Sequence, residues 1–327
     1  MASYQQWIQG ARPKTLAAAA APVIVGSGAA ARAGGFHLGY ALLAAGVAFA
    51  LQVGVNFAND YSDGIRGTDL NRVGPLRLTA SGLARPGHVR LASFVSFGVA
   101  GLFGLALSGL TAHWWLIAVG ASCVAAGWFY TGGKKPYGYA GLGDVGVFVF
   151  FGLVATLGTQ FTQTGSISFL GLVGACAMGL LACAILMVNN IRDIPGDTVA
   201  GKRTLAVQLG PVRAAKWYAS MIWLPVLVAL FLGLTTSSGM FLVIFLAGPA
   251  ALMSAAVYIQ ARMRATSPVL LDGVGGVGGL DGLGGPGAAG PRGLMGKVAG
   301  PVLLQATAAF QLAYALIFGL SLAFGGR

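Results

Sequence analysis

Long apolar stretches, each close to the length of a membrane-spanning helix, alternate with short polar segments along the chain. A helix needs about 20 mostly apolar residues to cross the hydrocarbon core of a bilayer. Nine stretches meet this requirement, at residues 16–33, 38–58, 90–111, 114–130, 143–162, 168–190, 214–235, 240–260 and 300–325. The pattern predicts an all-α integral membrane protein with nine transmembrane helices. A cleaved signal peptide is the alternative for the first stretch, although its apolar run is long for one.

The composition points to the same class of protein. Of the 327 residues, 56% are hydrophobic and only 9% are charged, against roughly a quarter charged in a typical soluble domain. The high apolar content also excludes a disordered chain. The net charge of +12 could suggest a nucleic-acid partner. Because the pattern leaves no room for a soluble basic domain, we expect no nucleic acid, and instead membrane lipid headgroups or an anionic substrate.

Basic residues are concentrated in alternate connecting segments. With a cytoplasmic N-terminus, 18 of the 20 Lys and Arg residues face the cytoplasm, and only Arg32 and Arg327 lie outside. The positive-inside rule therefore predicts a cytoplasmic N-terminus. The same orientation places all eight acidic residues, which are all Asp, on the cytoplasmic side. We expect a multi-pass protein of the cell (plasma) membrane whose active site faces the cytoplasm.

The first Asp segment, residues 56–69, follows the second apolar stretch. Asn56, Asp60 and Asp63 have the spacing i, i+4 and i+7, which places them on one face of a helix. Asn59 and Asp63 form a second pair four residues apart. The glycines that follow are expected to end the helix.

The second Asp segment, residues 189–197, follows the sixth apolar stretch. Asn189 and Asp193 are again four positions apart, so the segment resembles the first. Pro195 and the glycine after it are expected to break the helix before Asp197.

Carboxylates placed this closely repel one another, and the cost rises beside a low-dielectric bilayer. Local pairing with Arg66, Arg72 or Arg192 is one explanation, but it does not explain why two similar segments exist. We therefore predict that the two segments face each other and hold a divalent cation. A set of oxygen ligands selects a hard ion such as Mg²⁺. The expected ligands are Asn56, Asp60, Asp63, Asp193 and Asp197.

Several loops on the same side carry groups that match an anionic substrate. These groups are Arg77, Tyr130, Lys134, Lys135, Tyr137 and Lys202. Each loop alone is typical of the cytoplasmic side of a membrane protein. Together with the Asp segments they predict a diphosphate pocket, with Mg²⁺ on one side and Lys and Arg on the other. We expect Arg77 and Lys134 to act on a substrate anion, whereas Asp144 is either a helix N-cap or a site residue.

Motifs that the sequence lacks disfavour several other classes of protein. The chain has no Walker motif, no metal-spaced His pair and no Ser/His/Asp set. A membrane transporter or lipid carrier is the non-enzyme alternative, but no acidic residue lies in the middle of an apolar stretch, where proton-coupled transporters usually need one. A CDP-alcohol phosphotransferase is disfavoured because its single Asp-rich signature is absent.

The residues resemble a known family. Asn-Asp-x-x-Asp at 59–63, followed by Asn-x-x-x-Asp-x-x-x-Asp at 189–197, is similar to the UbiA superfamily of intramembrane prenyltransferases. Ala-Arg-Pro-Lys-Thr at 11–15, Gly-Leu-Gly-Asp at 141–144 and Gly-Lys-Arg-Thr at 201–204 are similar to the branch that prenylates 1,4-dihydroxy-2-naphthoate. The resemblance implies one transmembrane prenyltransferase domain over residues 1–327, a nine-helix bundle, and Mg²⁺ that bridges the Asp segments to a prenyl diphosphate.

The resemblance also implies a reaction. A polyprenyl group passes from an isoprenyl diphosphate to 1,4-dihydroxy-2-naphthoate, with loss of CO2 and diphosphate, to give demethylmenaquinone. Another aromatic acceptor, such as homogentisate or 4-hydroxybenzoate, is the alternative within the family. The residues then expected to be catalytic are Asp60, Asp63, Arg77, Lys134, Asp193 and Asp197. Those expected to bind substrate are Arg12, Lys14, Asn56, Asn59, Asp69, Tyr130, Lys135, Tyr137, Asp144, Asn189, Asn190 and Lys202.

A Gly-rich tract occupies residues 272–296, in a cytoplasmic loop of the predicted topology. Its glycine content is too high for a stable helix, so we expect a flexible linker that is dispensable for chemistry. A calcium-binding nonapeptide repeat is an alternative, but the spacing to Asp281 is off by one residue and no second copy occurs. A flexible cover over the active site is the functional alternative.

Overall fold

A computed structural model of the chain describes residues 2–68, 76–236, 239–266 and 291–325, and the side chains among these except for 291–300. These residues form helices and contain no β-strand, which confirms the all-α prediction for them. The α-helices are α1 (Tyr4–Ala11), α2 (Leu16–Arg32), α3 (Leu38–Ile65), α4 (Pro86–Leu110), α5 (Leu116–Phe129), α6 (Gly143–Val147), α7 (Ala155–Thr164), α8 (Phe169–Val199), α9 (Leu205–Leu209), α10 (Pro211–Thr236), α11 (Ala247–Thr266) and α12 (Pro291–Phe324). Shorter helical segments of other types are η1 (Pro13–Thr15), η2 (Tyr137–Ala140), η3 (Phe148–Val154) and η4 (Gly239–Leu246).

The chain is a multi-pass membrane protein. Within the described residues, 8 helical segments are long and apolar enough to cross a membrane. The predicted span at 114–130 forms α5, which has 14 residues. At about 1.5 Å per residue this helix is roughly 21 Å long, against a hydrocarbon core of about 30 Å. The ninth span therefore stays a prediction.

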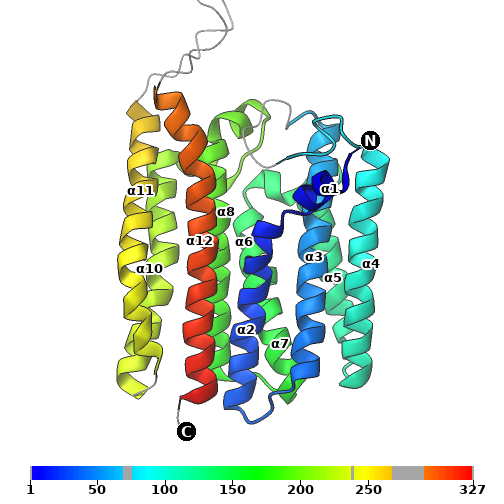
Figure 1. The fold of residues 1–327 in the computed structure, drawn as a ribbon, viewed down its shortest axis with the longest axis vertical. Coiled ribbons are helices and arrows are strands. Elements are labelled where there is room, and N and C mark those ends of the chain that lie inside the picture. The colour runs from blue at the N-terminus through cyan, green and yellow to red at the C-terminus, as the bar shows by residue number, and fades with distance from the viewer. Residues whose placement is uncertain (1, 69–75, 237–238, 267–290, 326–327) are drawn as a thin grey trace, which may run out of the picture.

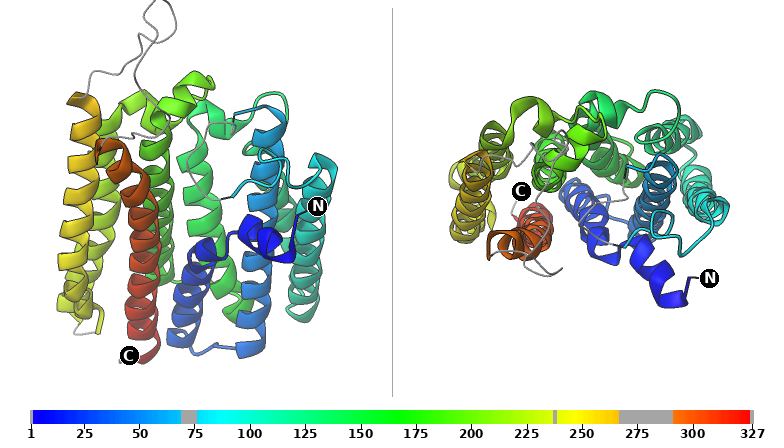
Figure 2. Two further views of the ribbon diagram at one scale, coloured as in Figure 1. Left: turned by 45° about the horizontal axis from the view of Figure 1, so that its top comes forward. Right: turned by 90° about the horizontal axis from the view of Figure 1, so that it is seen from above.

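The long helices run side by side along one axis, and α1 lies across them near one end (Figures 1 and 2). In the packing, α3 lies against α4, α12 against α2, and α8 against α10. Tyr218 of α10 and Tyr314 and Phe318 of α12 are completely buried in the main apolar core. Large apolar side chains such as Leu102 and Phe231 are exposed on the outside, where a helix bundle in a membrane meets lipid rather than water.

The bundle gathers its polar loops at one end. The C-terminal ends of α3 and α8 both reach this end, together with the loops that follow α5 and α8 (Figure 1). The two Asp segments are therefore neighbours in space although more than a hundred residues separate them in sequence. Asp69 lies outside the described residues, as do residues 272–290 of the Gly-rich tract.

Helix α8 does not break at Pro195, which corrects the sequence prediction. The helix includes Pro195 and continues to Val199. A proline inside a helix leaves the carbonyl four residues before it without its usual donor. Here that carbonyl belongs to Ile191, and Arg264 of α11 donates to it from Nη1 at 2.8 Å. This contact replaces the missing hydrogen bond and lets the helix carry Asp197 one turn beyond Asp193.

The start of α12 also differs from the prediction. The helix begins at Pro291, so residues 291–296, the end of the Gly-rich tract, are helical rather than part of a linker. Proline is well suited to a first helical position because its missing N–H has no partner there.

Candidate active site

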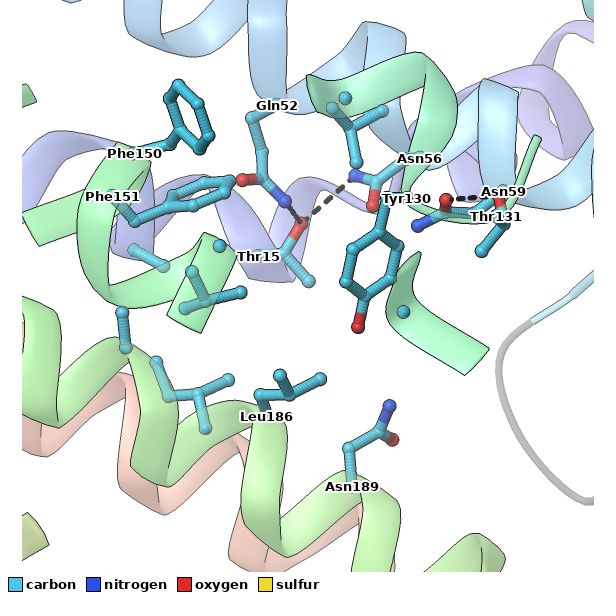
Figure 3. Close-up of a pocket in the computed structure, with 18 of the residues that line it drawn as sticks. Thr15, Gln52, Asn56, Asn59, Tyr130, Thr131, Phe150, Phe151, Leu186 and Asn189 are labelled. Carbon is cyan, nitrogen blue, oxygen red and sulfur yellow. Dashed lines mark hydrogen bonds between the residues drawn. The ribbon is translucent and has the colours of Figure 1, made fainter. Parts of the chain in front are cut away.

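One cavity of about 290 Å³ lies between the helices, close to the polar end of the bundle. Its deeper lining is apolar and includes Ala18, Ala48, Leu51, Phe150, Phe151, Ile185, Leu186 and Leu304. The lining also includes polar and charged side chains. In Figure 3, Phe150 and Phe151 lie on one side of the cavity, and Asn56, Asn59, Tyr130 and Asn189 lie on the other. A single space therefore joins a hydrocarbon surface to a set of polar side chains.

Most of the residues predicted to bind substrate or metal line this cavity. They are Arg12, Asn56, Asn59, Asp63, Arg77, Tyr130, Tyr137, Asn189, Asn190, Asp197 and Lys202. The structure places six others outside the lining: Lys14, Asp60, Lys134, Lys135, Asp144 and Asp193. The three lysines among these six are exposed. Their roles stay predictions.

Two carboxylates and two cations meet at the polar end. Lys202 Nζ lies 3.3 Å from Asp63 Oδ1 and 3.9 Å from Asp197 Oδ1. Arg77 Nη2 lies 3.6 Å from Asp63 Oδ2. Asp63 is 3% exposed and Lys202 is 7% exposed, so these charges interact with little screening by water. Lys202 thus contacts one carboxylate at the end of α3 and one at the end of α8.

The donor set fits a hard divalent cation. Around the Asp63 and Asp197 carboxylates, the cavity is lined by the side-chain amides of Asn56, Asn59 and Asn189, which add oxygen ligands of the kind that Mg²⁺ prefers. The Lys202 ammonium already lies between the two carboxylates, so this point stabilises positive charge. In the described part of the chain, no three His, Cys, Asp or Glu side chains lie close enough to hold an ion by themselves.

The N-terminal segment is attached to α3 through amide side chains. Asn56 Nδ2 donates to the Ala11 carbonyl at 2.9 Å and to Thr15 Oγ1 at 3.1 Å, and Gln52 Nε2 donates to the same hydroxyl at 3.2 Å (Figure 3). Between these contacts, Arg12 has a left-handed backbone with φ of 56°. Such a conformation is uncommon outside glycine and is one that surrounding contacts have to stabilise.

Tyrosines surround the charged groups. The Tyr139 hydroxyl donates to Asp63 Oδ1, and the Lys202 ammonium lies 4.6 Å from the centre of the Tyr139 ring. Burial raises the pKa of Tyr137 to about 12. Burial, assisted by the nearby Asp63 carboxylate, also raises the pKa of Tyr139. The hydroxyls of Tyr137 and Tyr139 therefore stay protonated at neutral pH, so each is able to donate a hydrogen bond.

Sequence reasoning missed Tyr139. Its signal was weak, because it is one of three tyrosines in a short loop and only the fold aims it at Asp63. It also missed Thr15 and Thr131, although Thr15 belongs to the segment 11–15 that carried the resemblance. The Thr131 hydroxyl donates to Asn59 Oδ1 at 2.8 Å and orients that amide at the cavity (Figure 3).

Asp60 and Asp193 each contact the protein itself. Asp60 accepts hydrogen bonds from the backbone N–H groups of Leu78 and Thr79 at 2.7 and 2.9 Å. Asp193 accepts from Arg192 Nε at 2.7 Å and Nη2 at 2.9 Å. This pair corresponds to the alternative considered in the sequence analysis, in which a nearby Arg, rather than a divalent cation, neutralises the carboxylate.

Asp144 is also buried. It is not the N-cap of α6, which is Leu142, and instead lies in the first turn of that helix. An acidic side chain at this position interacts favourably with the helix dipole.

The fold and the cavity define a class of membrane protein, and the comparisons with known proteins agree. The chain belongs to the UbiA prenyltransferase family, which residues 19–270 match. It is 55% identical over 222 residues to the 1,4-dihydroxy-2-naphthoate octaprenyltransferase of Mycobacterium tuberculosis, covering 68% of this chain and 76% of that one. It is 40% identical over 225 residues to the enzyme of the same name from Escherichia coli, covering 67% and 73%.

A solved structure shares the fold. A UbiA homologue from Archaeoglobus fulgidus bound to GPP and Mg²⁺ superposes with a TM-score of 0.54 at 14% sequence identity, covering 95% of this chain and 99% of that one. At this identity the likeness concerns the fold alone. The match to the family model and the 55% identical relative confirm, at the level of the family, the resemblance inferred from the Asp segments.

Proposed function

We propose that this protein transfers a polyprenyl group from an isoprenyl diphosphate to 1,4-dihydroxy-2-naphthoate, with release of CO2 and diphosphate. The product is demethylmenaquinone in its reduced form, which belongs to menaquinone biosynthesis. The observation that carries the proposal is the cavity, because its apolar lining continues directly into the charged end that holds Asp63, Arg77, Asp197 and Lys202. A prenyl diphosphate has the same division into a hydrocarbon chain and a charged head. The names of the relatives supply the acceptor.

The charged end binds the diphosphate. Asp63 and Asp197, with the neighbouring Asn side chains, would hold Mg²⁺, which neutralises the diphosphate charge and makes it a better leaving group. Arg77 and Lys202 supply cationic donors to the phosphate oxygens. Tyr139 donates to Asp63 and keeps that carboxylate oriented. Together these groups stabilise the charge that builds up on the diphosphate as the C–O bond breaks.

The apolar lining holds the prenyl chain and protects the reactive carbon. Phe150, Phe151 and Leu186 exclude water from the region where an allylic cation would form, so hydrolysis does not compete with transfer. The ring carbon of the naphthoate that carries the carboxylate is electron-rich. It attacks the allylic carbon of the prenyl chain and forms the new C–C bond. Loss of CO2 then returns the electron pair to the ring. Arg12 lines the same cavity and is proposed to bind a substrate anion.

The proposed arrangement in the membrane follows from charge. We propose that α5 completes a nine-helix bundle and that the N-terminus and the charged end of the cavity face the cytoplasm, at the plasma membrane. The support is the positive-inside distribution of Lys and Arg, because the loops at the cavity end carry Arg77, Lys134, Lys135 and Lys202. We further propose that residues 1–327 form one domain.

The test is direct reconstitution. Purified protein receives Mg²⁺, 1,4-dihydroxy-2-naphthoate and prenyl diphosphates of increasing length, and products are identified by mass. We expect a prenylated naphthoquinol that lacks the carboxylate, and no product after chelation of the divalent ion. Homogentisate and 4-hydroxybenzoate are the matched acceptors. Faster turnover of either one than of the naphthoate would contradict the proposed acceptor.

A further inference from the structure

A buried carboxylate accepts hydrogen bonds from the turn that carries Arg77 into the cavity. We define the Arg77 turn as residues 77–82, in the connection between α3 and α4. Arg77 is 9% exposed and faces Asp63. The turn is closed internally, because Ser81 N donates to the Arg77 carbonyl at 3.1 Å and Gly82 N donates to the Thr79 carbonyl at 3.1 Å.

Asp60 uses both of its carboxylate oxygens on this turn. Oδ2 accepts from Leu78 N at 2.7 Å, and Oδ1 accepts from Thr79 N at 2.9 Å. Asp60 is 1% exposed and does not line the cavity. Hydrogen bonds to a charged carboxylate are stronger than neutral ones. Without Asp60, two N–H groups of the turn would be buried without an acceptor, which is costly.

Apolar contacts fix the same turn from other directions. Leu78 is fully buried and packs with Phe57 of α3 and Val89 of α4. A Cβ added to Gly10 of α1 would lie 2.8 Å from Leu78 Cδ1. The turn is therefore enclosed by three helices, and its position depends on contacts that are remote from the substrate.

A glycine one helical turn after Asp60 also contacts this turn of the chain. A Cβ added to Gly64 of α3 would lie 2.4 Å from the Thr79 methyl group. Only a residue without a side chain lets Thr79 approach α3 closely enough for Asp60 to accept both N–H groups.

We propose that Asp60 is a positioning residue, whose carboxylate holds the Arg77 turn so that the guanidinium faces Asp63 and the diphosphate, and that it is not a ligand of the divalent ion. The proposal rests on the proposed function for the identity of the anion. In this assignment the two Asp residues of the first segment have different roles. Asp63 faces the ion, and Asp60 acts through Arg77.

The main test is a double-mutant cycle on diphosphate binding. Wild type, Asp60→Asn, Arg77→Ala and the double variant are purified, and the affinity for inorganic diphosphate is measured by calorimetry with Mn²⁺ present. We expect each single substitution to weaken binding by ~10-fold or more. The double variant should bind no more weakly than Arg77→Ala, because residues that act through one contact are not additive. Losses that multiply in the double variant would overturn the proposal.

Ion binding is the readout that a metal ligand would change and a positioning residue would not. Mn²⁺ bound to the same proteins is measured by electron paramagnetic resonance. Asp60→Asn should bind Mn²⁺ with wild-type affinity, whereas Asp63→Asn should bind it more weakly. If Asp60→Asn loses Mn²⁺ as Asp63→Asn does, Asp60 is a ligand and the proposal is wrong. Diphosphate binding is measured without the aromatic substrate. A failure of prenyl transfer to the naphthoate would therefore contradict the proposed function without affecting this test.

Gly64→Ala tests the geometry without removing a charge. The added methyl group should push Thr79 away from α3 and displace Arg77, so diphosphate affinity should fall while Mn²⁺ affinity stays unchanged. Gly87→Ala is the matched control, because a Cβ there meets nothing within 4 Å. If Asp60→Asn fails to fold, the cycle of Gly64→Ala with Arg77→Ala replaces it. Wild-type diphosphate affinity in Gly64→Ala would overturn the proposal.

Discussion

The ends of α3 and α8 hold their carboxylates in different ways. At the end of α3, Asp60 and Asp63 are 1% and 3% exposed, and Asp60 accepts from the backbone of a distant turn. At the end of α8, the Asp193 and Asp197 side chains are 9% and 14% exposed, and Asp193 pairs with Arg192, its neighbour in sequence. One end is built into the protein interior, and the other is closer to the surface.

The two ends also share a rule. In each pair the second Asp lines the cavity and lies near Lys202, whereas the first lies outside the cavity lining. The two ends differ in what holds the first Asp, which is the backbone of a distant turn for Asp60 and the neighbouring Arg192 for Asp193. The α3 end depends on long-range contacts, so substitutions there should disturb the substrate site more widely than substitutions at the α8 end.

The largest effect is expected at the two carboxylates that face the cavity. Asp63→Asn and Asp197→Asn should each lower turnover by ~100-fold or more, because each removes charge from the proposed ion site. Turnover of purified protein with saturating Mg²⁺ is the measurement. Asp193→Asn is the control within the same helix and should lose less. Equal losses in Asp193→Asn and Asp197→Asn would show that the carboxylate lining the cavity and the one outside it matter equally for turnover.

The next effect concerns Arg77. Arg77→Ala should lower kcat/KM by an amount equivalent to about 2–4 kcal/mol, as expected for a buried, charge-assisted contact with the diphosphate. The exposed Arg85, which precedes α4, is the matched control, and Arg85→Ala should retain wild-type kinetics. If Arg77→Ala has wild-type kinetics, Arg77 does not contribute to diphosphate binding or to turnover.

A smaller effect is expected for Tyr139→Phe, which keeps the ring but removes the donor to Asp63. Turnover should fall by roughly 10-fold, the low end of the value of one hydrogen bond to a charged group, about 1.5 kcal/mol. Because the pKa of Tyr139 is raised, its protonated form persists to higher pH than in an ordinary phenol. Wild-type activity should therefore show no loss from phenol ionisation up to pH about 10. Tyr4→Phe, at an exposed position in α1, is the control.

The smallest effect is expected for Lys134 and Lys135. Both are exposed and outside the cavity lining, and exposed charges contribute little. Lys134→Ala and Lys135→Ala should each change kcat/KM by less than about 2-fold, measured beside Lys202→Ala, which should lose far more. A loss in Lys134→Ala as large as in Lys202→Ala would instead place Lys134 in the diphosphate pocket, as the sequence predicted.

Local pattern was enough to predict much of the fold and part of the site. The apolar stretches predicted the positions of the long helices, because their length and periodicity are local properties. The spacing of Asn56, Asp60 and Asp63 predicted a shared helix face, and the structure places all three in α3 as buried residues. Pro195 was misjudged because the residue that compensates it, Arg264, lies on another helix.

The division between Asp60 and Asp63 could be decided only by tertiary structure. Both residues lie on the same face of α3, so helical periodicity treats them alike. What separates them is the element each meets: the backbone of the Arg77 turn for Asp60, and Lys202 and Tyr139 for Asp63. Chain pattern therefore dictated the helices, the membrane class and the chemical character of the site. The role of each carboxylate depended on contacts between residues far apart in sequence, and such contacts exist only once the chain has folded.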